Sequence, residues 1–221
     1  MNSKGNCIFC KQSFARSGMS RHLKSCKKRA EKIAECDGKA KSKMPIYHLQ
    51  VQDFYDGAFW LHLEMAGDAK LDHLDGYLRA IWLECCDHMS QFSFDKWGEE
   101  LDFDIQARKF LQPGMELVHT YDFGDTSLTK IKVVAKRVGA MLKKKPIFLM
   151  ARNDEPEYTC KECGKKAEWL CIECLYEHDE ATLCDKHAET HPCDEYGEPM
   201  EIVNSPRVGM CAYDGPADPP Y

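Results

Sequence analysis

Closely spaced cysteines and histidines near the C-terminus most strongly constrain what this chain of 221 residues can fold into. Nine of them lie between Cys160 and Cys193. Eight form consecutive pairs: Cys160 and Cys163, Cys171 and Cys174, Cys184 and His187, His191 and Cys193. A structural zinc ion takes four nitrogen or sulfur ligands in a tetrahedron. Eight ligands therefore predict two zinc sites, in a region too small to build a hydrophobic core of its own.

Two ligand arrangements fit this order of pairs. In a cross-brace, alternate pairs share an ion, with Cys160, Cys163, Cys184 and His187 on one and Cys171, Cys174, His191 and Cys193 on the other. In a sequential arrangement, the first two pairs share an ion. The cross-brace is favoured because it locks both halves of the region together. His178 and Cys211 are spare residues that could replace a predicted ligand.

The alternative to zinc is a set of disulfides, which needs an oxidising compartment. The N-terminus has no apolar segment typical of a secretory signal, and no apolar run reaches the length of a membrane span. A cytoplasmic protein with reduced thiols and no membrane contact is therefore expected.

A second metal motif opens the chain. It consists of Cys7, Cys10, His22 and Cys26. The first pair suits a turn between two short strands, and the spacing of the second pair places both ligands on one face of a helix. The pattern resembles a ββα zinc finger with cysteine as the last ligand, although the gap between the pairs is one residue shorter than usual. It predicts a third zinc ion, with Phe14, Met19 and Leu23 as a small apolar core.

Charge is distributed unevenly along the chain. The net charge is +9 over residues 1–43, −4 over 44–150 and −11 over 151–221, for a total of −6. This asymmetry indicates a weak and non-specific contact with DNA or RNA confined to the N-terminus. The alternative is a solvated basic linker. The candidate nucleic-acid residues are Arg16, Ser20, Arg21, Lys24, Lys27, Lys28 and Arg29.

The predicted organisation is a basic zinc finger over residues 1–36, a linker over 37–45, a body over 46–151, the double-zinc region over 158–213 and a flexible tail over 214–221. Apolar residues alternate near residues 47–51 and 59–65, which predicts two strands. Strands are also expected near 88–94, 115–122 and 126–138, with an edge strand at 146–151. Helical periodicity covers residues 69–86, with Cys85 on the core face. The fold class is α+β, a mostly antiparallel sheet covered by one long helix and flanked by two small zinc-binding modules.

Residues 121–125, Tyr-Asp-Phe-Gly-Asp, lie between the last two long strands. With the strand and helix layout upstream, they resemble the plasmid pRiA open-reading-frame-three-like family over about residues 45–140. Some members are also similar over paired C-terminal cysteines followed by a segment like residues 204–211. The resemblance implies plasmid or mobile-element biology and an activity that is largely undefined. The arginine pair that often follows the family's tryptophan is replaced here by Leu61 and His62 after Trp60.

Residues 121–125 are expected to form a structural turn, because acidic residues beside glycine are common in turns. The alternative is a divalent-cation site or a partner-binding loop.

No catalytic residues are predicted. The chain is therefore interpreted as a non-enzymatic zinc-binding adaptor associated with nucleic acid through its finger. Two alternatives stay open. One is a protein scaffold acting through the C-terminal zinc region, which resembles B-box-like cross-brace modules in ligand order. The other is an unrecognised enzyme using the body.

Overall fold

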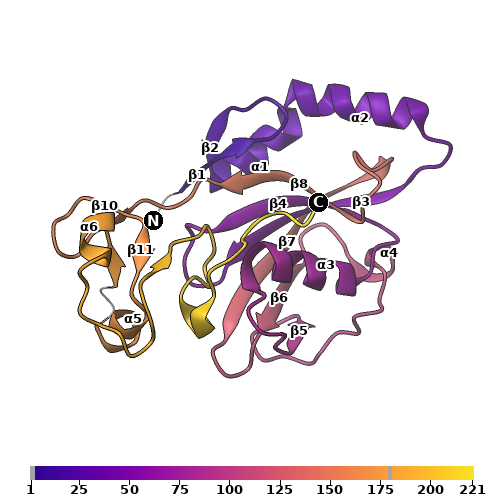
Figure 1. Ribbon diagram of the computed structural model, residues 1–221. Helices are drawn as coiled ribbons and strands as arrows, with labels where there is room; N and C mark the ends of the chain where they lie inside the picture. Colours follow the sequence, from indigo (N-terminus) through magenta and orange to yellow (C-terminus); the bar gives the residue numbers. More distant parts are fainter. Residues whose placement is uncertain (1–2, 179–180) are drawn as a thin grey trace.

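An eight-stranded sheet forms the centre of the computed structural model, which describes residues 3–178 and 181–221 (Figure 1). Residues 1–2 of the expected finger and 179–180 of the expected double-zinc region lie outside the described part. The strand order is β2-β1-β8-β4-β3-β7-β6-β5, and each described pairing is antiparallel. The strands are β1 (Lys4–Cys7), β2 (Ser13–Ala15), β3 (Met44–Asp53), β4 (Trp60–Ala66), β5 (Ser90–Ser93), β6 (Glu116–Tyr121), β7 (Ser127–Gly139) and β8 (Ile147–Asn153). The expected mixture of helices with a mostly antiparallel sheet is thus confirmed.

Strand β4 is buried at all seven positions, because both faces of the sheet are covered. Leu63 is paired with Leu49 of β3 and belongs to the main core, which includes the residues of helix α3 (Leu71–Leu78). Side chains alternate between the faces of a strand. The intervening residues Trp60 and Glu64 therefore face the N-terminal helices, where Trp60 packs with Met19.

The expected long helix over residues 69–86 is wrong in its extent. Helix α3 passes into a π-helical turn at Arg79–Leu83, and Glu84 then has extended dihedral angles. The described residues contain six short helices rather than one long one. The others are α1 (Arg16–Ser25), α2 (Lys27–Lys39), α4 (Ala107–Phe110), α5 (Ile172–His178) and α6 (Asp185–Ala188). Among the described residues, no helix has the length and hydrophobicity to span a membrane.

The N-terminal segment is built into the sheet rather than separated from it. Strand β1 pairs with β8, so β8 is an internal strand and not the expected edge. Helices α1 and α2 lie on the face of the sheet opposite α3 (Figure 1). Helix α2 continues to Lys39 and β3 begins at Met44, so only residues 40–43 of the expected linker lie between regular elements.

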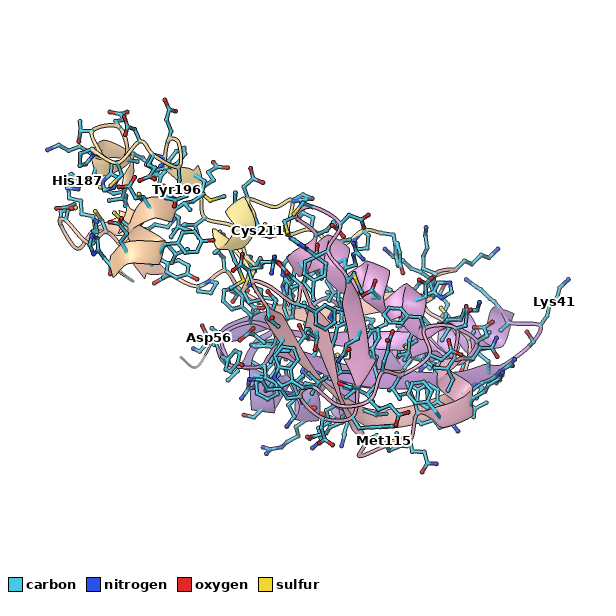
Figure 2. All side chains as sticks on the ribbon, turned by 90° about the horizontal axis from the view of Figure 1, so that it is seen from below. Lys41, Asp56, Met115, His187, Tyr196 and Cys211 are labelled. Atoms are coloured by element: carbon cyan, nitrogen blue, oxygen red, sulfur yellow. The ribbon has the colours of Figure 1, made fainter. Side chains whose placement is uncertain are left out.

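The region predicted to bind two zinc ions, called here the C-terminal zinc region, extends from one end of the body, and Cys211 lies where the two meet (Figure 2). Its short strands are β9 (Tyr158–Thr159), β10 (Lys166–Ala167), β11 (Trp169–Leu170), β12 (Thr182–Leu183) and β13 (Met200–Glu201), and a 3-10 turn follows at Met210–Ala212. Residues 214–221, expected as a flexible tail, return to the body. Ala217 is buried, and the ring of Tyr221 lies 5.6 Å from that of Tyr77.

Candidate metal centres

Cysteine and histidine side chains converge at four places among the described residues. At each place the ligand atoms of three cysteines and one histidine all lie within 4.8 Å of one another, so each group could hold a metal ion. Three groups contain the ligands expected from the sequence, and one does not. The groups are Cys7, Cys10, His22 and Cys26; Cys160, Cys163, Cys184 and His187; Cys171, Cys174, His191 and Cys193; and Cys85, Cys86, His88 and Cys211.

The separations between ligand atoms fit a tetrahedral zinc ion. Zn–S bonds of about 2.3 Å and Zn–N bonds of about 2.0 Å place two sulfurs about 3.8 Å apart and a sulfur and a nitrogen about 3.5 Å apart. The Sγ atoms of Cys7 and Cys26 are 4.0 Å apart, and those of Cys163 and Cys184 are 3.8 Å apart. A disulfide would need about 2.05 Å, and all thirteen cysteines are free thiols. The donor atoms therefore fit zinc, although the separations between a histidine nitrogen and a sulfur range from 3.5 Å down to 2.9 Å.

Two of the cysteine pairs form the same local structure. In each, the residue after the second cysteine has a left-handed backbone: Lys11 has φ 63° and Gly164 has φ 69°. The amide of that residue donates to the carbonyl of the first cysteine, at 2.8 Å from Lys11 to Cys7 and 2.8 Å from Gly164 to Cys160. This tight turn points both thiols of a pair toward one centre. A Cys-x-x-Cys sequence can therefore act as one half of a metal site.

The finger site is formed between the two N-terminal strands and helix α1. His22 lies on α1, and its Nε2 is 3.2 Å from the Sγ of Cys10, while Phe14 stacks on the imidazole ring with centroids 4.2 Å apart. Met19 and Leu23 are buried as expected. Burial raises the pKa of Cys7 to about 11, so a bound cation would have to displace its proton.

The C-terminal ligands converge in alternate pairs, which is the cross-brace and not the sequential arrangement. Lys161, next to the first ligand of one site, donates from Nζ to the Sγ of Cys174 in the other site at 3.1 Å. Burial raises the pKa of Cys160, but the backbone of Cys184 and the side chain of His187 lower it to about 6. His178 is exposed and lies outside both groups.

The fourth group contains Cys85 and Cys211. Cys85 lies just beyond the π-helical turn rather than inside a long helix, but it packs against the main core as expected, and its Sγ is 3.6 Å from that of Cys86. Cys211 does not compete for the C-terminal zinc sites but lies 3.6 Å from Cys86, sulfur to sulfur. The signal in the sequence was Cys85-Cys86-x-His88. It was weak because its remaining ligand is more than a hundred residues away along the chain.

The expected turn at residues 121–125 binds a buried arginine side chain. Arg207 is 0% exposed. It donates from Nη2 to Asp122 Oδ2 at 2.7 Å and from Nη1 to the carbonyl of Asp125 at 2.7 Å, and it lies over the ring of Tyr121. Phe123 is half exposed. The two sequence segments that carried the family resemblance therefore contact each other.

The candidate nucleic-acid residues differ in their exposure. Arg21, Lys24, Lys27 and Lys28 are exposed on α1 and α2, whereas Arg16 and Ser20 are half-buried. Arg29 already has protein partners. It donates to the buried carboxylate of Glu64 at 2.8 Å and to the carbonyl of Leu23 at 2.9 Å. The geometry thus assigns Arg29 to the attachment of α2 to the sheet.

Comparison with solved structures gives a weak structural likeness. No protein-family model matches this chain, and no curated protein matches it. A crystal structure of MM3350, a protein of unknown function from Methanosarcina mazei Go1, covers 55% of this chain and 75% of its own, with 14% sequence identity and a TM-score of 0.39. This likeness is too weak to bear on function.

Proposed function

We propose that this protein is a zinc-stabilised adaptor that binds nucleic acid weakly through a basic face, which we define as Arg21, Lys24, Lys27 and Lys28. The observation that carries the proposal is the exposure of these four cations on two helices that are fixed to the sheet. Lysine and arginine side chains neutralise phosphates whatever the sequence, and the resulting contact is salt-dependent. The family resemblance adds a role in plasmid or mobile-element biology to the proposal.

Positive charge continues beyond the basic face onto other elements. Lys24 and Lys136 of β7 line one small hollow, which also contains His48. Burial lowers the pKa of His48, and the nearby His62, Arg29 and Lys24 lower it further. A larger groove of about 690 Å³ is lined by Lys39 and Lys41 near the end of α2 and by the run Lys143 to Lys145.

The acidic part of the chain lies away from these cations. Lys41 marks the end of the body opposite the C-terminal zinc region, where His187 and Tyr196 lie (Figure 2). The C-terminal region over residues 158–213, with a net charge of −7, thus lies at the opposite end of the body from Lys41. Exposed charges separated by more than about 8 Å are largely screened at physiological ionic strength, so the acidic region leaves the basic face attractive to phosphates.

The test is fluorescence anisotropy with DNA and RNA oligonucleotides across a salt series. The double variant Arg21→Ala/Lys24→Ala should weaken binding about tenfold at low salt and reduce the slope of affinity against salt by about two phosphate contacts. Zinc content should not change. The matched control is Lys109→Ala/Lys165→Ala, which removes the same charge from exposed positions outside the basic face.

Equal weakening by both double variants would show a general charge effect and would contradict a defined basic face. An intact protein that binds neither nucleic acid at low salt would contradict the proposal itself.

A second function, protein scaffolding, is favoured by exposed aromatic residues in the C-terminal zinc region. Tyr176 and Tyr196 are each 55% exposed, and their ring centroids are 6.1 Å apart. Exposed tyrosines are common at protein interfaces. If this function is the main one, Tyr176→Ala/Tyr196→Ala should abolish co-purification of a specific partner from the native host and leave oligonucleotide binding unchanged.

A further inference from the structure

We propose that Cys85, Cys86, His88 and Cys211 bind one zinc ion and that this ion fastens the C-terminal segment, residues 204–213, to the body. This fourth site is independent of nucleic-acid binding. Its ligands come from two places: the end of the π-helical turn with the residues leading to β5, and the 3-10 turn at Met210–Ala212.

The four donor atoms are placed as a zinc ion requires. The Sγ atom of Cys86 is 3.6 Å from that of Cys85 and 3.6 Å from that of Cys211. These separations are close to the edge of about 3.8 Å expected between two zinc-bound thiolates and far longer than a disulfide bond. The Nε2 of His88 is 3.5 Å from Cys211 Sγ and 2.9 Å from Cys86 Sγ. The last separation is about 0.6 Å shorter than a sulfur–nitrogen edge of about 3.5 Å, and the two sulfur–sulfur separations are about 0.2 Å shorter than theirs.

Backbone conformation on both sides of the cluster supplies independent support. Asp87, between two of the ligands, has φ 60°, and Cys211 and Ala212 have φ 51° and 53°. Left-handed conformations are unfavourable for residues other than glycine. Such residues persist where the surrounding structure holds them, and they concentrate at functional sites. Here they turn His88 and Cys211 toward the same point.

A buried cation adjoins the cluster. Three thiolates, one imidazole and one Zn²⁺ carry a net charge of −1. The guanidinium of Arg207 is next to this charge, with Nη2 3.4 Å from Cys85 Sγ. Lys161 lies in the same relation to Cys174 in a predicted zinc site. The carboxylate of Asp122 is also near His88, but it forms an ion pair with Arg207 and is therefore not assigned as a ligand. The ligands are the three thiolates and the imidazole.

The fourth site differs from the other three in what it joins. Each of the others takes all its ligands from a span of fewer than forty residues, whereas this one joins His88 to Cys211. Its ion would therefore add to the contacts that already hold the segment, such as the 2.6 Å bond from Ser205 Oγ to the carbonyl of Trp82. Loss of the ion should loosen residues 204–213 and leave the two zinc modules folded.

The experiment compares the zinc content of the intact protein with that of Cys211→Ser, both purified under reducing conditions without chelator. The variant should lose one zinc per chain. The result is the difference in zinc content between the two proteins, so incomplete zinc loading of another site affects both equally. The matched control is Cys36→Ser, whose cysteine on α2 lies outside the four groups of described residues. It should lose none. Hydrogen exchange of residues 204–213 should become at least tenfold faster in Cys211→Ser.

Cys86→Ser provides a second variant. It should disturb folding less, because the Cys86 side chain lies at the surface. It should also lose one zinc per chain. Cobalt substitution should give tetrahedral thiolate absorption that each serine variant lowers by one site. If both variants keep the zinc content of the intact protein, the proposal is overturned. A Cys85–Cys86 or Cys86–Cys211 disulfide found by mass spectrometry in the reduced preparation would also overturn it.

Discussion

At the scale of single residues, the buried histidine pair of β3 and β4 makes stability depend on pH. His48 Nε2 and His62 Nδ1 are 2.8 Å apart. Burial is the largest cause that lowers the pKa of His48 to about 2 and that of His62 to about 4. The folded protein keeps both rings neutral, while the unfolded chain takes up protons below about pH 6.5. Their stabilisation is thus complete above that pH and is lost as the pH falls.

We expect His48→Gln to reduce this pH dependence. Between pH 7.5 and 5.5, one neutral buried histidine accounts for a loss of about 1.4 kcal/mol in the free energy of unfolding. The variant should lose about that much less than the intact protein over this range. Urea unfolding at several pH values measures the difference. His178→Gln, at an exposed position, should behave like the intact protein, and identical pH profiles for all three would contradict the argument.

At the scale of elements, an ion network joins helix α2 to the sheet. Glu64 of β4 is 1% exposed in its side chain. It accepts from Arg29 of α2 at 2.8 Å and from Arg137 of β7 at 2.9 Å. Removing one partner from a buried network leaves uncompensated charge, which costs about 3–5 kcal/mol. The network therefore fixes the helix that carries part of the basic face.

Glu64→Ala should lower the free energy of unfolding by about 3 kcal/mol or more, because two arginines lose their carboxylate. Denaturant unfolding measures the change. The matched control is Glu116→Ala, whose carboxylate pairs with Lys130 and Lys132 at the surface. Surface pairs contribute about 0–1 kcal/mol. Similar losses in both variants would show that the buried network has no special role.

At the scale of the whole molecule, the predicted zinc finger is part of the body. Trp60 and Met150 are 0% exposed and pack with Met19 of the finger, and β1 covers one edge of β8. Deleting residues 1–43 should therefore destabilise the body by roughly 3–6 kcal/mol, from two large side chains uncovered at about 1.5–3 kcal/mol each. An unpaired strand edge also promotes association.

Binding of an apolar dye and size-exclusion chromatography measure this effect. The truncated protein should bind more dye and form aggregates. The full-length Arg21→Ala/Lys24→Ala variant, which loses charge without uncovering Trp60, should do neither. A truncated protein that stays monomeric with unchanged dye binding would mean that the finger is dispensable to the body. For this reason point substitutions test nucleic-acid binding better than deletion does.

Much of the local structure could be predicted from the sequence, because its causes are local. Alternating apolar residues predicted β3 and β4, and Cys-x-x-Cys spacing identified the tight turns that place two thiols together. Ligand order also favoured the alternate pairs that converge in the C-terminal region. These features depend on residues close together in the chain, where backbone geometry limits the choices.

Only the tertiary structure decided the long-range features. Pairing of β1 with β8 made the finger part of the sheet, and strand pairing between distant segments leaves little mark on local sequence pattern. The meeting of Cys85, Cys86 and His88 with Cys211 is similar, since no spacing rule connects ligands from opposite ends of a fold. Arginine side chains are mostly exposed, and Arg207 is buried because the turn at residues 121–125 supplies its acceptors. The sequence alone determined the ligands of three metal groups and most of the strands, while folding brought together the ligands of the fourth group.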